Sequence, residues 1–215
     1  MRFSPRQYDS VRRNYNRLSF ALDDALYQVC RRYPNHRSRA GVHAKLWLIG
    51  RGYATGIERK IKSAGTQGSS MGQLDQHFWR NRRRIDQAIR MLRRVKEPLT
   101  LKKLAKILDA HGKMIRIVQP ALRKGQTPRS FVAKYLHFHR PAVPVYDSFA
   151  QKELRKLYPW KRSYALFHIN DSTDEEYAKF VFRFWQLYSD ARAAGARVLV
   201  KRLDNYLLAL ARQKQ

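Results

Sequence analysis

Cysteine and long apolar stretches are almost missing from this sequence. Cys30 is the only cysteine among 215 residues, so the chain can form no internal disulfide and no cysteine-ligated iron–sulfur cluster or zinc finger. No apolar run approaches the roughly 18 residues that a membrane-spanning helix needs, and the N-terminus has no apolar core of a secretory signal. We therefore expect a protein of the prokaryotic cytoplasm that has no membrane association.

Acidic residues are also scarce compared with basic ones. Lys plus Arg number 45 and Asp plus Glu number 16, which gives a formal net charge of +29. The basic residues are spread from Arg2 to Lys214, so no single basic tail explains the excess. Such a charge opposes compaction unless a polyanion neutralises it, and neutralised phosphates of a nucleic acid release condensed counterions. The composition therefore predicts a nucleic-acid-binding protein.

Strand patterns are confined to Val143-Pro144-Val145, which is too short to support a sheet. Elsewhere the apolar residues recur at helical spacing, and 44% apolar residues are enough to build a core. Ser38 and Thr100 are expected as helix caps, Ser148 with Gln151 as a capping box, and residues 64–72 as a loop. The sequence predicts an all-α fold with helices at about 5–33, 38–49, 73–96, 100–110, 112–123, 128–139, 148–158, 173–194 and 197–212.

The stretch from Gly125 to Ala150, GQTPRSFVAKYLHFHRPAVPVYDSFA, carries the clearest signal of chemistry. A glycine turn precedes a helix, a proline-flanked link follows, and Asp147 stands at the start of the next helix. A glycine turn before a helix exposes backbone N–H groups that bind phosphate. The segment can therefore hold a nucleic-acid backbone near a carboxylate, which is a suitable geometry for chemistry at a sugar.

This stretch resembles the hallmark of the helix-hairpin-helix (HhH-GPD) superfamily of DNA glycosylases, which includes endonuclease III and the 8-oxoguanine glycosylases. Those proteins have an L-P-G-V-G-x-K-T-A hairpin, a helix, and then P-x-x-V-D at the start of the next helix. Aligned without gaps, Asp147 falls on the family's aspartate, Gly125 on the first hairpin glycine and Ser130 on the threonine. Thr127 replaces the second glycine, and Tyr146 precedes the acid where valine is usual.

The resemblance implies a fold and a partner. It implies a single two-lobed glycosylase-like domain over residues 1–215, with a DNA-binding cleft between the lobes. Residues 1–72 and 151–215 would form one lobe. Residues 73–150, with the hairpin at 125–130, would form the other. The expected partner is duplex DNA with a flipped, modified base, bound by a monomer.

The resemblance also implies a mechanism in which Asp147 is the catalytic carboxylate. It would stabilise oxocarbenium-like charge on the deoxyribose of an extruded nucleotide and orient the attacking water. Arg129 occupies the position that bifunctional members fill with a catalytic lysine, and a guanidinium stays protonated. Lys134 lies near in sequence but does not align with that nucleophile. We therefore predict a monofunctional glycosylase that leaves an abasic site and uses no cofactor.

Further residues are candidates for DNA contact and for a base pocket. Tyr53 and Trp79 adjoin glycine-rich or polar stretches and are the preferred aromatic pocket residues, and Glu58 is a rare acid able to read a base edge. Alternatively, Glu58 forms an ion pair with Arg59 or Lys62, and the basic run at 80–84 is a solvated helix face. The expected DNA contacts are Lys124, Gly125, Gln126, Thr127, Arg129, Ser130, Lys134, Arg82 and Arg83.

Metal binding is not expected, because His137 and His139 point about 200° apart on a helix and no other His or Cys cluster has ligand spacing. The competing function is a non-catalytic helix-hairpin-helix protein that uses the hairpin as a phosphate clamp, with Asp147 acting only as a helix cap. A basic ribosome-associated protein is a weaker third interpretation. The target base is left open between a damaged base, as in DNA repair, and a hypermodified pyrimidine of phage DNA, as in antiviral defence.

Overall fold

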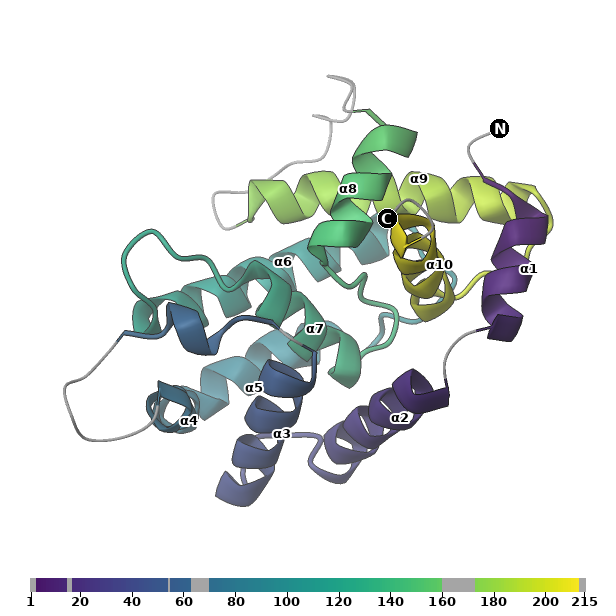
Figure 1. Ribbon diagram of the computed structural model, residues 1–215. Coiled ribbons are helices and arrows are strands. Elements are labelled where there is room, and N and C mark those ends of the chain that lie inside the picture. Colours follow the sequence, from purple (N-terminus) through teal and green to yellow (C-terminus); the bar gives the residue numbers. More distant parts are fainter. Residues whose placement is uncertain (1–2, 15–16, 54, 63–69, 160–172, 213–215) are drawn as a thin grey trace.

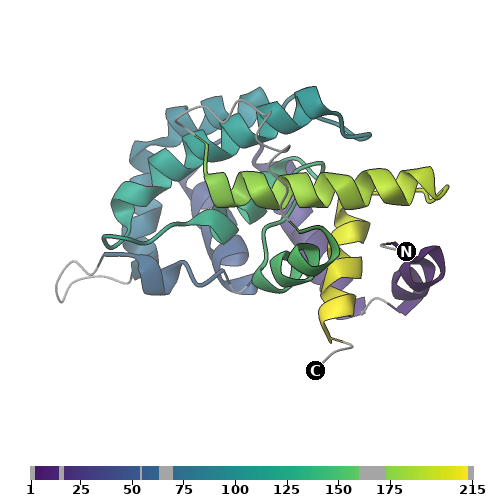
Figure 2. The ribbon, with the colours of Figure 1, turned by 90° about the horizontal axis from the view of Figure 1, so that it is seen from above.

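The computed structural model describes residues 3–14, 17–53, 55–62, 70–159 and 173–212, and it is helical (Figures 1 and 2). The predicted all-α class is confirmed, and within the described ranges the only β-type pairing is an isolated bridge between Ile61 and Leu122. The helices are α1 (Pro5–Asn14), α2 (Arg17–Arg32), α3 (Arg39–Gly52), η1 (Glu58–Lys60), α4 (Ser70–Arg80), α5 (Arg82–Met91), α6 (Leu101–Val118), η2 (Gln119–Ala121), α7 (Arg129–His139), α8 (Ser148–Leu157), α9 (Glu175–Ala193) and α10 (Val200–Arg212).

The N-terminal region forms two helices where the apolar spacing predicts one over 5–33. α1 packs against α10, whereas α2 packs against α3 and α7 (Figure 1). Residues 15–16, between them, lie outside the described part. The single-helix prediction is therefore wrong, because the two halves cover different parts of the core.

The basic helix predicted at 73–96 is also divided, into α4 and α5. Asn81 lies at the break with φ −94° and ψ 9°, and its side-chain Nδ2 donates to the carbonyl of His77 at 3.0 Å. Asparagine side chains compete for backbone groups in this way and favour turns over helix interiors. The predicted loop at 64–72 ends earlier than expected, since α4 begins at Ser70, and residues 63–69 lie outside the described part.

The two helices predicted at 100–110 and 112–123 are one helix, α6. Thr100 caps it as predicted, because its hydroxyl accepts from the backbone N–H of Lys103 at 3.4 Å. Gly112 is buried within the helix, and the buried stripe continues on both sides of it, with Leu108 before and Ile115 after. Packing of this stripe outweighs the cost of an interior glycine, about 1 kcal/mol.

Helix caps explain most of the remaining boundaries. Ser38 caps α3 as predicted, accepting from Gly41 N at 3.2 Å. α8 is capped by Asp147, not by the predicted Ser148, and α9 is capped by Asp174. Val143-Pro144-Val145 forms a buried link and no strand.

α7 is a central helix of the core, and every residue from Phe131 to His139 is buried. It packs against α2, α3 and α6, while α8 packs against α9 and α10 (Figure 2). One apolar cluster contains residues from both predicted lobes, so the two-lobe division stays a prediction. Among the described helices, none combines the length and apolar character needed to cross a bilayer.

Candidate active site

A pocket of about 260 Å³ lies at the start of α8, bounded by α2, the end of α3, α7 and α10. Ligand pockets have volumes of about 300–1,000 Å³, so this space lies near the lower end and suits a small chemical group. We call it the Asp147 pocket. Its lining residues are Leu22, Asp23, Gly52, Tyr53, Lys134, Val145, Asp147, Lys201, Asp204, Leu208 and Arg212.

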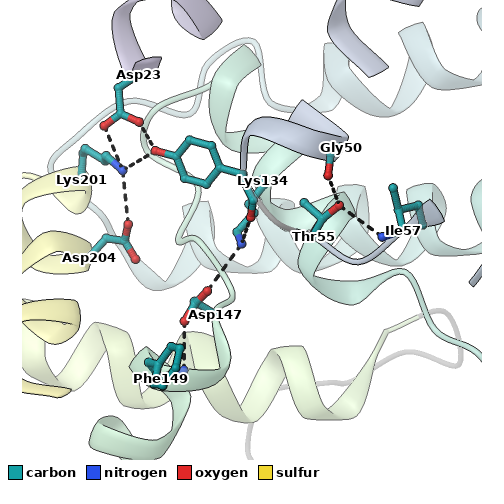
Figure 3. A network of polar contacts seen from close by, with 10 residues as sticks. Asp23, Gly50, Thr55, Ile57, Lys134, Asp147, Phe149, Lys201 and Asp204 are labelled. Carbon is teal, nitrogen blue, oxygen red and sulfur yellow. Dashed lines mark hydrogen bonds and ion pairs between the residues drawn. The ribbon is translucent and has the colours of Figure 1, made fainter. Parts of the chain in front are cut away.

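Asp147 combines a capping role with a place in the pocket. Its Oδ1 accepts from the backbone N–H of Phe149 at 2.9 Å, and its Oδ2 lies 3.5 Å from Nζ of Lys134 (Figure 3). The side chain is 23% exposed, so a bound molecule can reach the carboxylate. The helix cap proposed as an alternative to catalysis is therefore present, and it leaves the carboxylate at the pocket.

Lys134 reaches this carboxylate from the buried helix α7. Its side chain is 5% exposed, and its Nζ donates to the carbonyl oxygen of Tyr53 at 3.0 Å. Burial lowers the pKa of Lys134, and the carboxylates of Asp147 and Asp204 oppose that change. Lys134, which we predict to contact DNA, forms part of the pocket wall, and its contact with DNA stays a prediction.

The opposite wall of the pocket is a polar cluster of Asp23, Tyr53, Lys201 and Asp204 (Figure 3). Lys201 Nζ lies 3.1 Å from Asp23 Oδ2 and 3.4 Å from Asp204 Oδ2, and it donates to the Tyr53 hydroxyl at 2.9 Å. That hydroxyl donates to Asp23 Oδ1. Burial raises the pKa of both carboxyls, and the Lys201 ammonium counteracts the rise.

Sequence reasoning missed Asp23, Lys201 and Asp204. A signal was present, because each acid interrupts the apolar face of a helix. Asp23 lies between buried or partly buried leucines of α2, and Asp204 is flanked on α10 by the buried Leu203 and Leu207. A charged residue on a buried face needs a partner, and this requirement marks such positions as candidates.

The predicted hairpin at 125–130 lies apart from the pocket lining. Gly125 adopts φ +78°, a left-handed conformation that favours glycine, and Lys124 and Gln126 beside it are exposed. Arg129 Nε forms a 2.6 Å ion pair with Asp174 Oδ1 at the start of α9. The turn is thus anchored to α9 through Arg129. Thr127 accepts a hydrogen bond at its carbonyl from Lys60 Nζ, and Ser130 is half-buried.

Trp79, Arg82 and Arg83 belong to a second hollow, which we call the basic groove. It has a volume of about 600 Å³, and the Arg82 guanidinium lies 4.6 Å from the centre of the Trp79 ring. Trp79 therefore does not line the Asp147 pocket. The groove is lined by His36, Arg37, Trp79, Arg82, Arg83, Asp86, Gln87 and Arg90.

Glu58 does not line the Asp147 pocket either. It lies in η1 and forms a 2.8 Å ion pair with Arg51, so an ion pair is present, although with a different partner from the predicted Arg59 or Lys62. Of the three residues predicted for a base pocket, Tyr53 is the one found beside Asp147. Its hydroxyl accepts from Lys201 and donates to Asp23, and its backbone carbonyl accepts from Lys134.

The described residues contain no cluster of three or more His, Cys, Asp or Glu side chains arranged to hold a metal ion. His137, a candidate weighed in the sequence, is buried, and its Nδ1 lies 2.7 Å from the carbonyl of Val143. Comparison of the chain with protein-family models, with curated proteins and with solved structures finds no match.

Proposed function

We propose that this protein is a DNA N-glycosylase that uses Asp147 to hydrolyse the bond between a modified base and its deoxyribose. The observation that carries the proposal is a carboxylate fixed by a backbone N–H and a buried lysine at a small pocket. The net charge of +29 supports binding of the phosphate backbone around that pocket. The resemblance of residues 125–150 to helix-hairpin-helix glycosylases supports the same assignment.

In the proposed reaction the C1′–N bond breaks and the base leaves with the bonding electrons. The carboxylate of Asp147 stabilises the positive charge that develops on the sugar, and it orients a water molecule for attack at C1′. The water oxygen becomes the new hydroxyl at C1′, and one water proton ends on the released base. Lys134 is a positioning residue that holds Oδ2 of Asp147.

We further propose that the reaction stops at the abasic site. Arg129, at the position of the family's nucleophilic lysine, is paired with Asp174 and carries no usable amine. The ammonium of Lys134 is engaged by the Tyr53 carbonyl and by Asp147. The proposed arrangement is the two-lobed helix-hairpin-helix fold, with a monomer binding duplex DNA in the cleft.

The proposal is tested by a mass-spectrometric screen for free bases released from DNAs that carry varied modifications. We expect Asp147→Asn to abolish release while binding of the same DNA is retained, because the amide keeps the helix cap but loses the negative charge. Ser148→Ala, at the exposed neighbouring position, is the matched control and retains release. A wild-type protein that releases no base from any DNA in the screen would contradict the enzymatic assignment.

The basic groove supports a second candidate function, a non-catalytic nucleic-acid-binding protein. Its exposed residues Arg37, Arg83 and Arg90 offer phosphate contacts that need no reaction at Asp147. A pure binding protein would bind at least as well after Asp147→Asn, since that substitution removes a negative charge near the phosphates. Equal DNA binding without any base release in the wild type would favour this function.

A further inference from the structure

Three carboxyl groups lie in one pocket of a strongly positive chain, among the basic residues Lys134, Lys201 and Arg212. The sequence has 16 acidic residues against 45 basic ones, yet Asp23, Asp147 and Asp204 all line the Asp147 pocket. The proposed chemistry at the sugar requires one carboxylate. The other two therefore need a separate explanation.

The hydrogen-bond donors of Lys201 and Tyr53, in the wall that contains Asp23 and Asp204, already have acceptors within the protein. An ammonium group has three N–H donors, and Lys201 Nζ has three acceptors within reach: Asp23 Oδ2 at 3.1 Å, Asp204 Oδ2 at 3.4 Å and the Tyr53 hydroxyl at 2.9 Å. The Tyr53 hydroxyl proton is directed to Asp23. Each carboxylate oxygen accepts about two hydrogen bonds. Within the cluster of Asp23, Tyr53, Lys201 and Asp204, the capacity that remains for a ligand is therefore acceptor capacity, whereas Arg212 at the pocket's edge offers donors of its own.

Asp204 provides an independent sign of a missing donor. Its side chain is 2% exposed, and its Oδ1 is buried with no hydrogen-bond partner among the residues that the structure describes. Figure 3 shows this oxygen directed away from Lys201, toward the side of the pocket where Asp147 and Lys134 lie. A buried acceptor without a donor is unfavourable, and an N–H or O–H group of a bound molecule would relieve that cost.

We infer that this wall recognises the extruded base itself, an inference that rests on the proposed function. Asp23 and Asp204 accept hydrogen bonds from a nucleobase that carries exocyclic N–H or O–H donors, while Leu22, Val145 and Leu208 contact its ring. Bases that present only carbonyl oxygens on this edge are disfavoured, because those oxygens would face carboxylates.

The test compares bases that differ by one amino group. Cytosine with 2-pyrimidinone, and adenine with unsubstituted purine, are placed opposite an abasic-site analogue in otherwise identical duplexes. Binding is measured by fluorescence anisotropy with the full chain carrying Asp147→Asn, so that no turnover occurs. We expect the amino-bearing member of each pair to bind at least about tenfold more tightly, as a hydrogen bond to a charged group predicts.

Adding Asp204→Asn should reduce this ratio to about one, because the amide can turn a donor toward the ligand. Asp24→Asn is the matched control, since Asp24 neighbours Asp23 in sequence but is 63% exposed and faces Arg31. It should preserve the ratio. If circular dichroism shows that Asp204→Asn is misfolded, Asp23→Asn tests the same acceptor wall.

Two results would overturn the inference. One is equal affinity for cytosine and 2-pyrimidinone and for adenine and purine. The other is a preference for the amino-bearing base that persists unchanged in the Asp204 and Asp23 variants. Base release by the wild-type chain is measured separately on the same duplexes and on the modified DNAs. If bases are released but the amino-bearing base is not preferred, only the proposed role of Asp23 and Asp204 in base recognition is overturned. If the binding preference exists and is lost in the variants, but no base is released from any DNA, that role is supported and the glycosylase assignment is overturned.

Discussion

Lys134 is, beside the backbone N–H of Phe149, one of two groups that fix the geometry of the proposed catalytic carboxylate. It is the side chain that holds Asp147 Oδ2, at 3.5 Å. Lys134→Met should slow single-turnover base release by about 10- to 100-fold, because a charge-assisted hydrogen bond contributes about 1.5–3 kcal/mol. DNA binding should change little. Lys152→Met, which removes an exposed charge from α8, is the control, and an equal loss in both variants would argue against a positioning role.

The same residue allows a test of the reaction's end point. Because the Lys134 ammonium is engaged by Asp147 and by the Tyr53 carbonyl, we expect borohydride to trap no covalent protein–DNA adduct during base release. Denaturing gel electrophoresis with labelled DNA measures this directly. An adduct present in the wild type and missing in Lys134→Met would show that Lys134 acts as a nucleophile and that the enzyme is bifunctional.

Lys45 gives a pH dependence of stability that is independent of function. It is fully buried, its Nζ donates to the carbonyls of Tyr33 and Asn35 at 3.1 Å, and burial lowers its pKa to about 8. Above pH 8 the folded state loses this proton while the unfolded state keeps it up to the ordinary pKa of 10.5. The unfolded state then binds more protons, so this residue's contribution to the free energy of unfolding rises with pH.

Between pH 8 and 9 the wild type should therefore gain about 1 kcal/mol relative to Lys45→Met. The free energy of unfolding of both proteins is measured with denaturant at pH 7, 8 and 9. The contributions of other titrating groups, such as Cys30 near Lys45, largely cancel in the difference between the two proteins. Parallel curves for the two proteins over this range would show that Lys45 does not titrate there.

At the scale of helices, Asp174 connects the predicted DNA-binding turn to α9. It accepts from the backbone N–H of Tyr177 at 2.8 Å as the helix cap and pairs with Arg129 at 2.6 Å. Asp174→Ser keeps a cap but removes the charge, whereas Asp174→Ala removes both. The alanine variant should be about 1 kcal/mol less stable than the serine variant in denaturant unfolding. Equal stabilities would mean that the cap contributes nothing to α9.

Helices were predictable where apolar periodicity was strong and local, and less predictable where packing decided the outcome. The sequence identified the all-α class and the caps Ser38 and Thr100. It divided α6 at residue 111, next to Gly112, because propensity alone does not reveal that a buried stripe continues across the glycine. It joined α4 to α5 across Asn81, whose side-chain hydrogen bond to His77 shows only in the folded chain.

The residues of the candidate site also fall into those that the local sequence reveals and those that only the tertiary structure brings together. Asp147 could be found because it belongs to a local motif, and Tyr53 because it follows a glycine-rich stretch. Asp23 and Asp204 come from opposite ends of the chain, on α2 and α10, and only the tertiary structure brings both to Lys201. Trp79 was placed with Tyr53 on local composition, whereas folding directs it to a different hollow.

For the whole molecule, the net charge of +29 predicts a steep dependence of DNA affinity on salt. Each phosphate contact changes the slope of log affinity against log salt by about 0.9. Arg83→Gln and Arg90→Gln, in the basic groove, should each make the slope shallower by about that amount. Arg31→Gln removes the same charge at a residue outside the groove that faces Asp24. A slope changed equally by all three would indicate diffuse attraction without a defined groove contact.

One ammonium group joins the end of α3 to the start of α8, since Lys134 holds both the carbonyl of Tyr53 and the carboxylate of Asp147. A rotation of α3 that displaces the Tyr53 carbonyl would move Nζ of Lys134, the nitrogen that contacts the Asp147 carboxylate. Docking forces on the N-terminal helices would thus be transmitted through a single side chain to the reacting atoms. DNA binding and the orientation of the Asp147 carboxylate would then depend on the same side chain, so that incorrectly bound DNA would leave the carboxylate misaligned.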